Sequence, residues 1–532
     1  MKRRNMIVAF LVGALLITGC GKNQTDKASG IDTETTKTVQ EDVNSFLEQL
    51  DTSSMFTERD MEQGYEAEGS VTVHLEDGKS TADSDAVQIQ ENVIRITEEG
   101  TYILDGTLTD GMVMVEAADT AKIQLVLNQV TITSKDSAAI YVKSADKVFV
   151  TTKEGTENDL TNGGTYTAID ENNIDAVIFS KSDLTLNGTG NLQITAGEGH
   201  GVVSKDDLVL TGGTYEIEAA SHGLSGKDSV RIGGGTYTIT SGKDGVHGSN
   251  TDDASLGYVY VADGNLNIQA EDDGIHADSA TMITGGTVNV SKSYEGLEGL
   301  GIEITGGEVR VVSSDDGLNA AGGNDSSGMK GSENDPFATT EGAYIQITGG
   351  TLTVDASGDG IDSNGEIRVT GGETYVSGPT NDGNGILDYS GSAVITGGVF
   401  VGTGSSGMAQ NFDQSSTQGT IMVTTTGTSA GEKVSLKNSD QKEIVSWEPD
   451  KEYSCVIISC PDIQEGETYT ITTGTESQEI TMDSLVYGSA GRGGDPGSGG
   501  GRGQGKGGAG RKNGDHMPPS MTGEAEEPES AL

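Results

Sequence analysis

The chain has 532 residues and a formal charge of −50, from 82 acidic and 32 basic side chains. This balance argues against nucleic acid as a partner, because phosphate binding requires a basic surface. Glycine is abundant, at 80 residues, but it follows no three-residue period. Collagen is therefore excluded, and the composition favours many short strands joined by glycine turns.

Residues 1–19 have the form of a bacterial export signal. A positive start, MKRR, precedes an apolar stretch from Met6 to Ile17 that is short for a membrane span. The next residues end in Cys20 and resemble a lipobox, in which the cysteine is lipidated and becomes the new N-terminus. We therefore expect a lipid anchor at Cys20, on the extracellular face of a bacterial cell membrane. An ordinary signal peptide followed by an unrelated cysteine is the alternative.

Residues 20–54 are polar and show no sustained period, so we expect a tether there. Residues 55–418 contain a repeat in which Gly201, Gly223 and Gly245 are 22 residues apart, and many units end a strand with a glycine pair, as in LVLTGGTYEIEA. Around this pair, apolar residues of one parity recur: Leu208, Leu210, Tyr215 and Ile217, then Ile232, Tyr237 and Ile239, then Ile283, Val288 and Val290, then Ile304, Val309 and Val311.

This pattern predicts an all-β fold, a right-handed parallel β-helix with about 22 residues per coil and coils about 4.8 Å apart. The apolar residues of each coil would stack inside the solenoid, and the glycine pair would turn the corner. Tyr215 and Tyr237 could form a platform for stacking sugars, but their column is otherwise Leu and Val, which favours core packing.

From about residue 419 the glycine corners disappear while strand alternation persists, which predicts a small β domain over 419–488 that closes the end of the solenoid. Cys455 and Cys460 are five residues apart on a predicted strand, so they point to opposite faces and are expected to be buried thiols. Residues 489–532 are glycine-rich and locally basic. We expect a disordered spacer there, although contact with an anionic wall polymer is an alternative.

Two columns of polar residues emerge when the coils are aligned on the turn glycine. The first comprises His200, His222, Asp244, Asp273, Glu295, Asp316 and Asp359, with Asp272 and Asp315 beside it. The second, three residues further along each coil, comprises Val203, Ser225, His247, His276, Glu298, Asn319 and Asp362. Carboxylates stacked one coil apart repel each other, so a counter-ion is expected.

Clusters of Asp, Glu and Asn oxygens are what a hard cation such as Ca²⁺ selects. We therefore predict calcium among the acidic residues Asp244, Asp272, Asp273, Glu295, Glu298, Asp315, Asp316, Asn319, Asp359 and Asp362. Solvated acidic turns without a metal are the alternative. His247 and His276 lie on adjacent coils, where a hydrogen-bonded turn ladder is favoured over a transition-metal site.

Several motifs occur in an order that resembles a family of clostridial carbohydrate-binding β-helix lipoproteins related in structure to pectate lyases. They are FTERD (56–60), GTYILDG, IYVKSADKVFV, EGTEND, the DDG and EGLEG turns, the ITGG corners, and MAQNF followed by SSTQ. The resemblance covers roughly residues 55–488. It implies a parallel β-helix, calcium at the acidic turns and a polysaccharide ligand such as cellulose or an acidic pectin-like polymer. The calcium role carries over onto Asp273, Glu295, Glu298 and Asp316, whereas no sugar-contacting residue can be assigned.

Three functions are consistent with these features. The first is calcium-dependent, non-catalytic binding of polysaccharide. The second is a polysaccharide lyase, which needs a Lys or Arg base near the calcium; Lys243 and Lys292 are the nearest in sequence, but no catalytic set is evident. The third is a calcium-stiffened stalk or adhesin. Arg231, Arg310 and Arg368 are predicted on outer faces, where surface salt bridges are the expected role.

Overall fold

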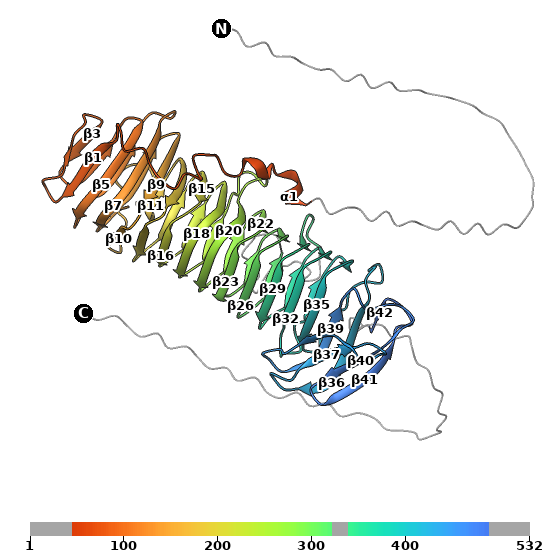
Figure 1. The fold of residues 1–532 in the computed structure, drawn as a ribbon. Coiled ribbons are helices and arrows are strands. Elements are labelled where there is room, and N and C mark those ends of the chain that lie inside the picture. Colours follow the sequence, from red (N-terminus) through yellow and green to blue (C-terminus); the bar gives the residue numbers. More distant parts are fainter. Residues whose placement is uncertain (1–44, 322–338, 489–532) are drawn as a thin grey trace, which may run out of the picture. The chain divides into compact units, whose positions relative to one another are not determined.

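A computed structural model describes residues 45–321 and 339–488 of the chain (Figure 1). The expected signal peptide, Cys20, most of the expected tether and the tail over 489–532 lie outside the described residues. Among the residues that are described, no helix is both long enough and apolar enough to cross a membrane.

Successive parallel strands build a solenoid, so the right-handed parallel β-helix predicted from the sequence is confirmed. One side is a 13-stranded sheet in which all neighbours except the first pair, β3 and β4, are parallel. Its strands are β3 (Val87–Gln90), β4 (Val93–Ile96), β6 (Met112–Glu116), β8 (Ile140–Ser144), β11 (Ala176–Ser180), β14 (His200–Ser204), β17 (Leu224–Gly226), β19 (Val246–Gly248), β21 (Ile275–Ala277), β24 (Leu297–Glu298), β27 (Leu318–Ala320), β30 (Ile361–Ser363) and β33 (Leu387–Tyr389).

A 25-stranded sheet forms the other two sides of the solenoid as two ladders joined by long strands. The joining strands are β5 (Gly100–Leu108), β7 (Lys122–Ser134), β18 (Ser229–Ser241) and β20 (Tyr258–Ala270). The first ladder also contains β9 (Lys147–Thr152), β12 (Asp183–Gly188), β15 (Asp207–Leu210), β22 (Ala280–Ile283), β25 (Gly301–Ile304), β28 (Tyr344–Ile347), β31 (Glu366–Val369) and β34 (Ala393–Ile395). The second contains β10 (Glu157–Asn162), β13 (Asn191–Ala196), β16 (Thr214–Ala219), β23 (Thr287–Lys292), β26 (Glu308–Ser313), β29 (Thr351–Ala356), β32 (Glu373–Ser377) and β35 (Val399–Gly404). At the N-terminal end, β1 (Val71–Glu76) pairs with Tyr102–Thr107 of β5 and so extends across both ladders. The short β2 (Thr81–Ala82) is antiparallel to β1.

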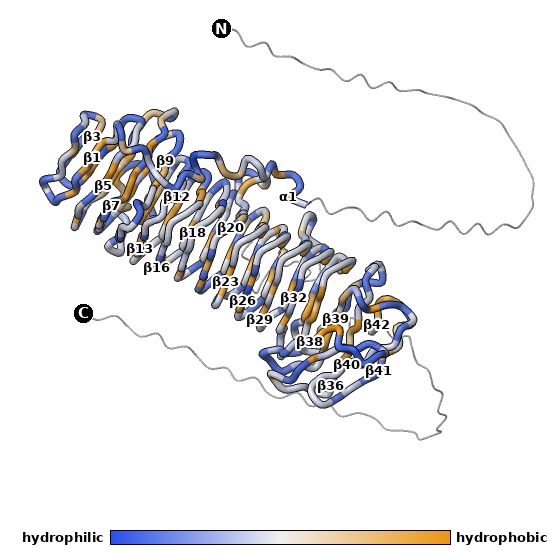
Figure 2. Tube along the Cα trace, viewed as in Figure 1, coloured by the Kyte–Doolittle hydropathy of each residue, from blue (hydrophilic) through white to orange (hydrophobic). Residues whose placement is uncertain are grey.

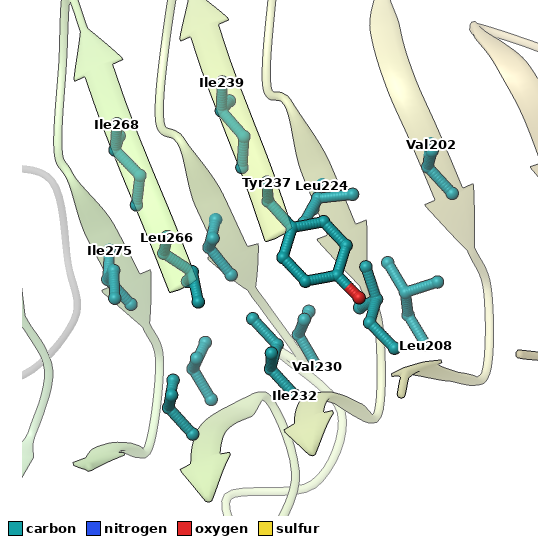
Figure 3. Packing of buried hydrophobic residues seen from close by; sticks show 14 of the residues in the cluster. Val202, Leu208, Leu224, Val230, Ile232, Tyr237, Ile239, Leu266, Ile268 and Ile275 are labelled. Carbon is teal, nitrogen blue, oxygen red and sulfur yellow. The ribbon is translucent and has the colours of Figure 1, made fainter. Parts of the chain in front are cut away.

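The core is the stack of apolar residues predicted from the parity of the strands. Each of those residues is buried, and apolar stretches recur on neighbouring strands (Figure 2). Tyr215 and Tyr237 stack on each other inside the solenoid, with ring centroids 5.2 Å apart, and the Tyr237 ring lies among Leu224, Val230 and Ile232 (Figure 3). Core packing, the favoured interpretation of these tyrosines, is therefore the correct one.

At the C-terminal end, β35 pairs antiparallel with β39 (Tyr453–Ser459), which also pairs with β36 (Thr420–Thr428). The last coil thus has no open edge on this side. Next to β36 lies β42 (Val486–Tyr487), and a separate four-stranded sheet contains β37 (Val434–Lys437), β38 (Glu443–Trp447), β40 (Thr468–Thr473) and β41 (Glu476–Thr481). Cys455 and Cys460 are free, buried and assigned to different core clusters, as predicted.

The expected tether over 20–54 is wrong for its last residues, because residues 45–54 are folded against the solenoid. They form α1 (Phe46–Gln49) and the 3-10 helix η1 (Thr52–Ser54), and contacts continue to Gly64. The Glu303 side chain, which is fully buried, accepts hydrogen bonds from the Ser45 hydroxyl (2.6 Å) and the Leu47 amide (2.8 Å). We call residues 45–64 the N-terminal segment. Polar partners hold it in place together with an apolar cluster, in which Met55 packs against Tyr258 and Met282.

Candidate functional site: two polar columns on the 13-stranded sheet

Strand register places the second polar column on the outer side of the 13-stranded sheet. Val203 pairs with Ser225, Ser225 with His247 and His247 with His276. Further along, Glu298 pairs with Asn319 and Asn319 with Asp362. Asp362 in turn pairs with Asp388, which the sequence alignment missed because an insertion before β33 shifts the period. The column predicted from the sequence is therefore correct and one carboxylate longer.

The first column is built by the backbone of the turn glycines. Gly274 donates its N–H to the Glu295 carbonyl, Gly296 to Asp316 and Gly317 to Asp359. Each residue before a turn glycine is therefore held one coil from its counterpart, close to the second column. This ladder brings the acidic residues of both columns together as predicted.

Three carboxylates gather at the C-terminal part of these columns. Oxygens of Asp316, Asp359 and Asp362 all lie within 4.8 Å of one another. Burial and the neighbouring carboxylates raise the pKa of Asp316 and of Asp362 well above the usual range, and burial first and then Asp388 raise the pKa of Asp359 to about 7. Backbone amides compensate only in part: Asp359 donates its N–H to Asp316 at 2.6 Å, and Gly385 donates to Asp359 at 2.5 Å. The fold therefore opposes ionisation of these three carboxyls, and a bound cation would favour their charged form.

Asn319 adds a buried acceptor to the same group. Its Nδ2 donates to Glu295 Oε2 at 2.8 Å, while its Oδ1 is buried and has no hydrogen-bond partner. The residue is 2% exposed, so water is not available in bulk to satisfy that oxygen. A buried acceptor without a donor costs free energy. Asn319 pairs in register with Asp362, which forms no ion pair with a lysine or arginine among residues 45–321 and 339–488. We call Asp316, Asn319, Asp359 and Asp362 the acidic cluster.

In the middle of the columns, His276 supplies positive charge that the sequence analysis did not anticipate. Its Nδ1 contacts Glu298 Oε2 and lies 3.4 Å from Asp273 Oδ2, and its Nε2 lies 3.4 Å from Asp278 Oδ1. The hydrogen bonds and charges of these carboxylates raise the pKa of His276 despite its burial, while burial and neighbouring acids raise the pKa of Asp273 to about 9. Glu298 and Asp273, both expected to bind calcium, thus have a histidine partner instead of only other acids.

Towards the N-terminal part, four imidazole rings form one continuous stack. The centroids of His200 and His222 are 4.9 Å apart, those of His222 and His247 4.1 Å, and those of His247 and His276 4.9 Å. The stack crosses from the first column to the second between His222 and His247. Aligning the coils on their turn glycine assigned each of these histidines to a column, but it did not show that the ring stack passes from one column to the other.

Two of these histidines contact the carboxylate of Asp244. Its Oδ2 lies 3.0 Å from His222 Nδ1 and 2.6 Å from His247 Nδ1. Burial opposes ionisation, but the hydrogen bonds from both histidines outweigh it and hold the pKa of Asp244 far below its usual range. Asp244 also lies within 4.8 Å of Asp272 and Asp273. Three of the predicted calcium ligands, Asp244, Asp272 and Asp273, thus belong to a mixed histidine–carboxylate region. The hydrogen-bonded ladder favoured for His247 agrees with this geometry.

The remaining predicted residues have identifiable surroundings. Asp315 approaches Tyr294, whose pKa is raised first by a hydrogen bond to that carboxylate. Lys292, one of two candidate lyase bases, pairs with the exposed Glu271. Arg231 pairs with Asp207, and Arg368 with Glu366 at 3.1 Å, which confirms the salt-bridge interpretation for both. A further group, Asp183, Asp206 and Asp207, was not predicted.

A family model for carbohydrate-binding domain-containing proteins matches residues 90–383, which are more than half of the chain. A protein of Acetivibrio thermocellus with the same description is 36% identical over 292 residues, which span 54% of this chain and 91% of that protein. The chain belongs to the carbohydrate-binding domain-containing protein family. The matched residues run from the end of β3 to within the loop before β33, so they contain both polar columns as far as Asp359 and Asp362, but not Asp388.

This chain is also similar to a solved structure, described as a gadolinium derivative of the polysaccharide lyase-like protein from C. thermocellum. The two chains are 31% identical and align with a TM-score of 0.40, over 47% of this chain and 93% of the other. Membership of the family, together with the solenoid, supports a carbohydrate partner.

Proposed function

We propose that this chain is a surface-anchored lipoprotein that binds cell-wall-type polysaccharide, cellulose or an acidic pectin-like polymer, without cleaving it and with the help of calcium. The observation that carries the proposal is the acidic cluster. Its three carboxylates lie within 4.8 Å of one another, and the buried Asn319 Oδ1 beside them has no partner. Family membership supports the carbohydrate ligand.

The residues of the acidic cluster fit a calcium ion. The atoms that are free to bind a metal ion are all oxygens, the ligand type that Ca²⁺ prefers. They belong to carboxylate and amide groups, as in known calcium sites. Asp316, Asn319, Asp359 and Asp362 would hold the ion. Within the described ranges, no lysine or arginine forms an ion pair with these three carboxylates. Asp244, Asp272 and Asp273 are a second candidate, but Asp244 already has two histidine partners.

A bound calcium ion would offer its remaining coordination positions to carboxylate or hydroxyl oxygens of a polysaccharide. Without such an ion, a chain with a formal charge of −50 would repel an acidic polymer. Binding without cleavage is favoured because Lys292 already pairs with Glu271, away from the acidic cluster. A calcium ion bound between protein and polymer would therefore allow this acidic surface to bind an acidic ligand.

Retention on polysaccharides tests the proposal. The full-length protein is incubated with polygalacturonate or cellulose, in calcium or in a chelator, while unsaturated sugar products are followed by absorbance. We expect retention that depends on calcium and no product. Release of unsaturated product would show a lyase instead, and absence of retention on every polysaccharide would favour a structural stalk or adhesin.

A variant with two neutralised carboxylates, Asp316→Asn and Asp362→Asn, connects retention to the acidic cluster. In chelator it should melt at a higher temperature than the parent, because two buried carboxyls whose ionisation the fold opposes are replaced by neutral amides. In calcium it should melt at a lower temperature and lose calcium-dependent retention. The exposed Asp440, replaced by Asn, is the control and should change neither property. A double variant that keeps the parent's calcium affinity in titration calorimetry would place the ion elsewhere.

Anchoring is tested separately at Cys20. The Cys20→Ser chain should leave the membrane fraction of a producing bacterium and appear in the medium or as uncleaved precursor. The same distribution for parent and variant would mean that the chain is not held by lipid at this residue.

A further inference from the structure

A row of lysines runs along the 13-stranded sheet upstream of the acidic columns. Lys181, Lys205 and Lys227 directly follow the last residues of β11, β14 and β17, and those last residues pair in register. Lys143 occupies the equivalent position on β8, because Ser180 pairs with Val142. The amides of the three later lysines each donate to the coil before, at 2.8–3.0 Å. We call Lys143, Lys181, Lys205 and Lys227 the lysine row.

Coil stacking gives the lysine row a regular spacing of about 4.8 Å between neighbours. The same position in the next two coils holds Ser249 and Asp278, whose amides continue the hydrogen-bonded series. The lysines therefore end at the coil where the first column becomes acidic, at Asp244, and the first two histidines of the stack share coils with Lys205 and Lys227. In a chain with 82 acidic and 32 basic residues, four successive lysines at one position are unusual. Carboxylates of Asp183, Asp206 and Asp207 gather just after Lys181 and Lys205.

Two lysines of the row have no carboxylate partner among the described residues. Lys181 is exposed and forms no ion pair, and the exposed Lys205 ammonium lies 5.4 Å from the centroid of the Phe179 ring. The lysines at the two ends are neutralised, Lys143 by Glu116 at 2.8 Å and Lys227 by Asp252 at 2.7 Å. The available positive charge is therefore centred on Lys181 and Lys205.

A groove of about 430 Å³ opens at this part of the lysine row. Its lining comprises Lys143, Lys181, Ser144, Ala145, Ser182 and the three carboxylates Asp119, Asp146 and Asp206, whereas Lys205 lies outside it. Asp146 already pairs with Lys122 at 3.3 Å, and burial together with Asp183 and Asp228 raises the pKa of Asp206 to about 6. The groove thus combines ammonium groups with hydroxyl and carboxylate acceptors, which suits a ligand that carries both carboxylates and hydroxyl groups.

We infer that the lysine row binds the carboxylates of an acidic polysaccharide, with Lys181 and Lys205 as the main contacts. This inference rests on the proposed function and assigns its ligand class, because neutral cellulose has no group that an ammonium ion pairs with. A polyuronate repeats its carboxylates along the chain, as the coils repeat their lysines. Charge-assisted hydrogen bonds from lysine to carboxylate then provide contacts that calcium does not.

Binding of three polymers to the full-length protein in calcium tests the inference. They are polygalacturonate, the same polymer with its carboxylates methyl-esterified, and cellulose. We expect Lys181→Ala with Lys205→Ala to weaken polygalacturonate binding about fivefold, since each exposed ion pair contributes modestly. Binding of the ester and of cellulose, and calcium affinity by calorimetry, should not change. Lys181→Arg with Lys205→Arg should restore most of the loss.

The matched control removes two positive charges elsewhere, through Lys153→Ala and Lys442→Ala, and should bind like the parent. If the Lys181/Lys205 variant binds polygalacturonate as tightly as the parent, or weakens equally on the ester, the inference is wrong while the proposed function stands. If duplex DNA binds the parent as tightly as polygalacturonate does, the row is a general polyanion surface and the assignment fails. A parent that retains no polysaccharide overturns the proposed function and the inference together.

Discussion

His276 separates the candidate site into two parts with different chemistry. On one side, Asp244, Asp273 and Glu298 share histidines, so positive charge is already present among them. On the other side, the atoms of the acidic cluster that are free to bind a metal ion are all oxygens. The sequence predicted that these residues lie in two columns, because the glycine period fixes the coil alignment. It could not predict which carboxylate faces a histidine, since the choice depends on side-chain directions between adjacent coils.

Glu298→Gln tests this separation. The glutamine cannot supply the charge that Glu298 presents to His276, and removing one partner of a buried ion pair costs on the order of 3 kcal/mol. We therefore expect a lower free energy of unfolding in urea, by similar amounts in calcium and in chelator. Asp362→Asn is the comparison and should lose stability only in calcium. Loss in calcium alone for Glu298→Gln would place that residue among the calcium ligands.

The raised pKa of Asp359 predicts how the stability of the calcium-free protein depends on pH. Its carboxyl has a pKa of about 7 in the folded chain, against an ordinary value of 3.8 for an aspartate, so between these values the folded state binds more protons than the unfolded state. The free energy of unfolding must then fall as pH rises from about 4 to 7. In chelator we expect a melting temperature at pH 7.5 that is lower than at pH 5, by roughly 3 °C or more. Other titrating groups contribute to the same curve, so the comparison between variants decides.

Asp359→Asn should flatten this part of the curve, whereas Asp440→Asn, at an exposed position, should leave it unchanged. Differential scanning fluorimetry across the pH range provides the measurement. An unchanged slope in the Asp359→Asn chain would mean that its carboxyl titrates alike in folded and unfolded states.

At the level of the coil, the two kinds of glycine have different physical roles. The sequence predicted positive φ at the glycine pairs, and the second glycine of a pair has it, as at Gly307 (φ 81°). The turn glycine before the second column is required for another reason. A Cβ added at Gly296 would lie 2.3 Å from the Gly317 carbonyl oxygen of the next coil. Such crowding between coils is a property of stacking distance, so no local sequence pattern reveals it.

Gly296→Ala should therefore destabilise the protein by about 3 kcal/mol or more, because the clash involves backbone that cannot move without displacing the next coil. Both polar columns pass through this turn, so calcium affinity should fall as well. Gly64→Ala is the control, since nothing lies within 4 Å of its added Cβ. Urea unfolding and calcium titration of both variants measure the effect, and a near-neutral Gly296→Ala would contradict this account of the turn.

Across the whole solenoid, the N-terminal segment links coils that otherwise contact only their neighbours. Its Ser45 reaches Glu303 on β25, its Asp60 pairs with Lys147 on β9 at 2.8 Å, and its Gly64 carbonyl accepts from Gln124 on β7 at 3.0 Å. It also covers outward-facing Tyr258, Tyr260 and Met282. Composition predicted a tether over 20–54, which includes the first part of this segment, because that stretch has no sustained period. Isolated polar and apolar contacts with distant coils leave no periodic trace.

Removal of this segment should change how the solenoid unfolds. In a stack of repeats with only nearest-neighbour contacts, the cooperativity of unfolding weakens with length. A segment that contacts several coils makes those coils unfold together. A chain that begins at residue 66 also leaves the Glu303 carboxylate and the Lys147 ammonium without these partners. We expect a broader urea transition with a smaller m-value, and increased binding of a hydrophobic dye to the uncovered tyrosines. The matched control begins at residue 45 and should unfold like the full chain. A single sharp transition in both chains would show that the coils couple without the segment.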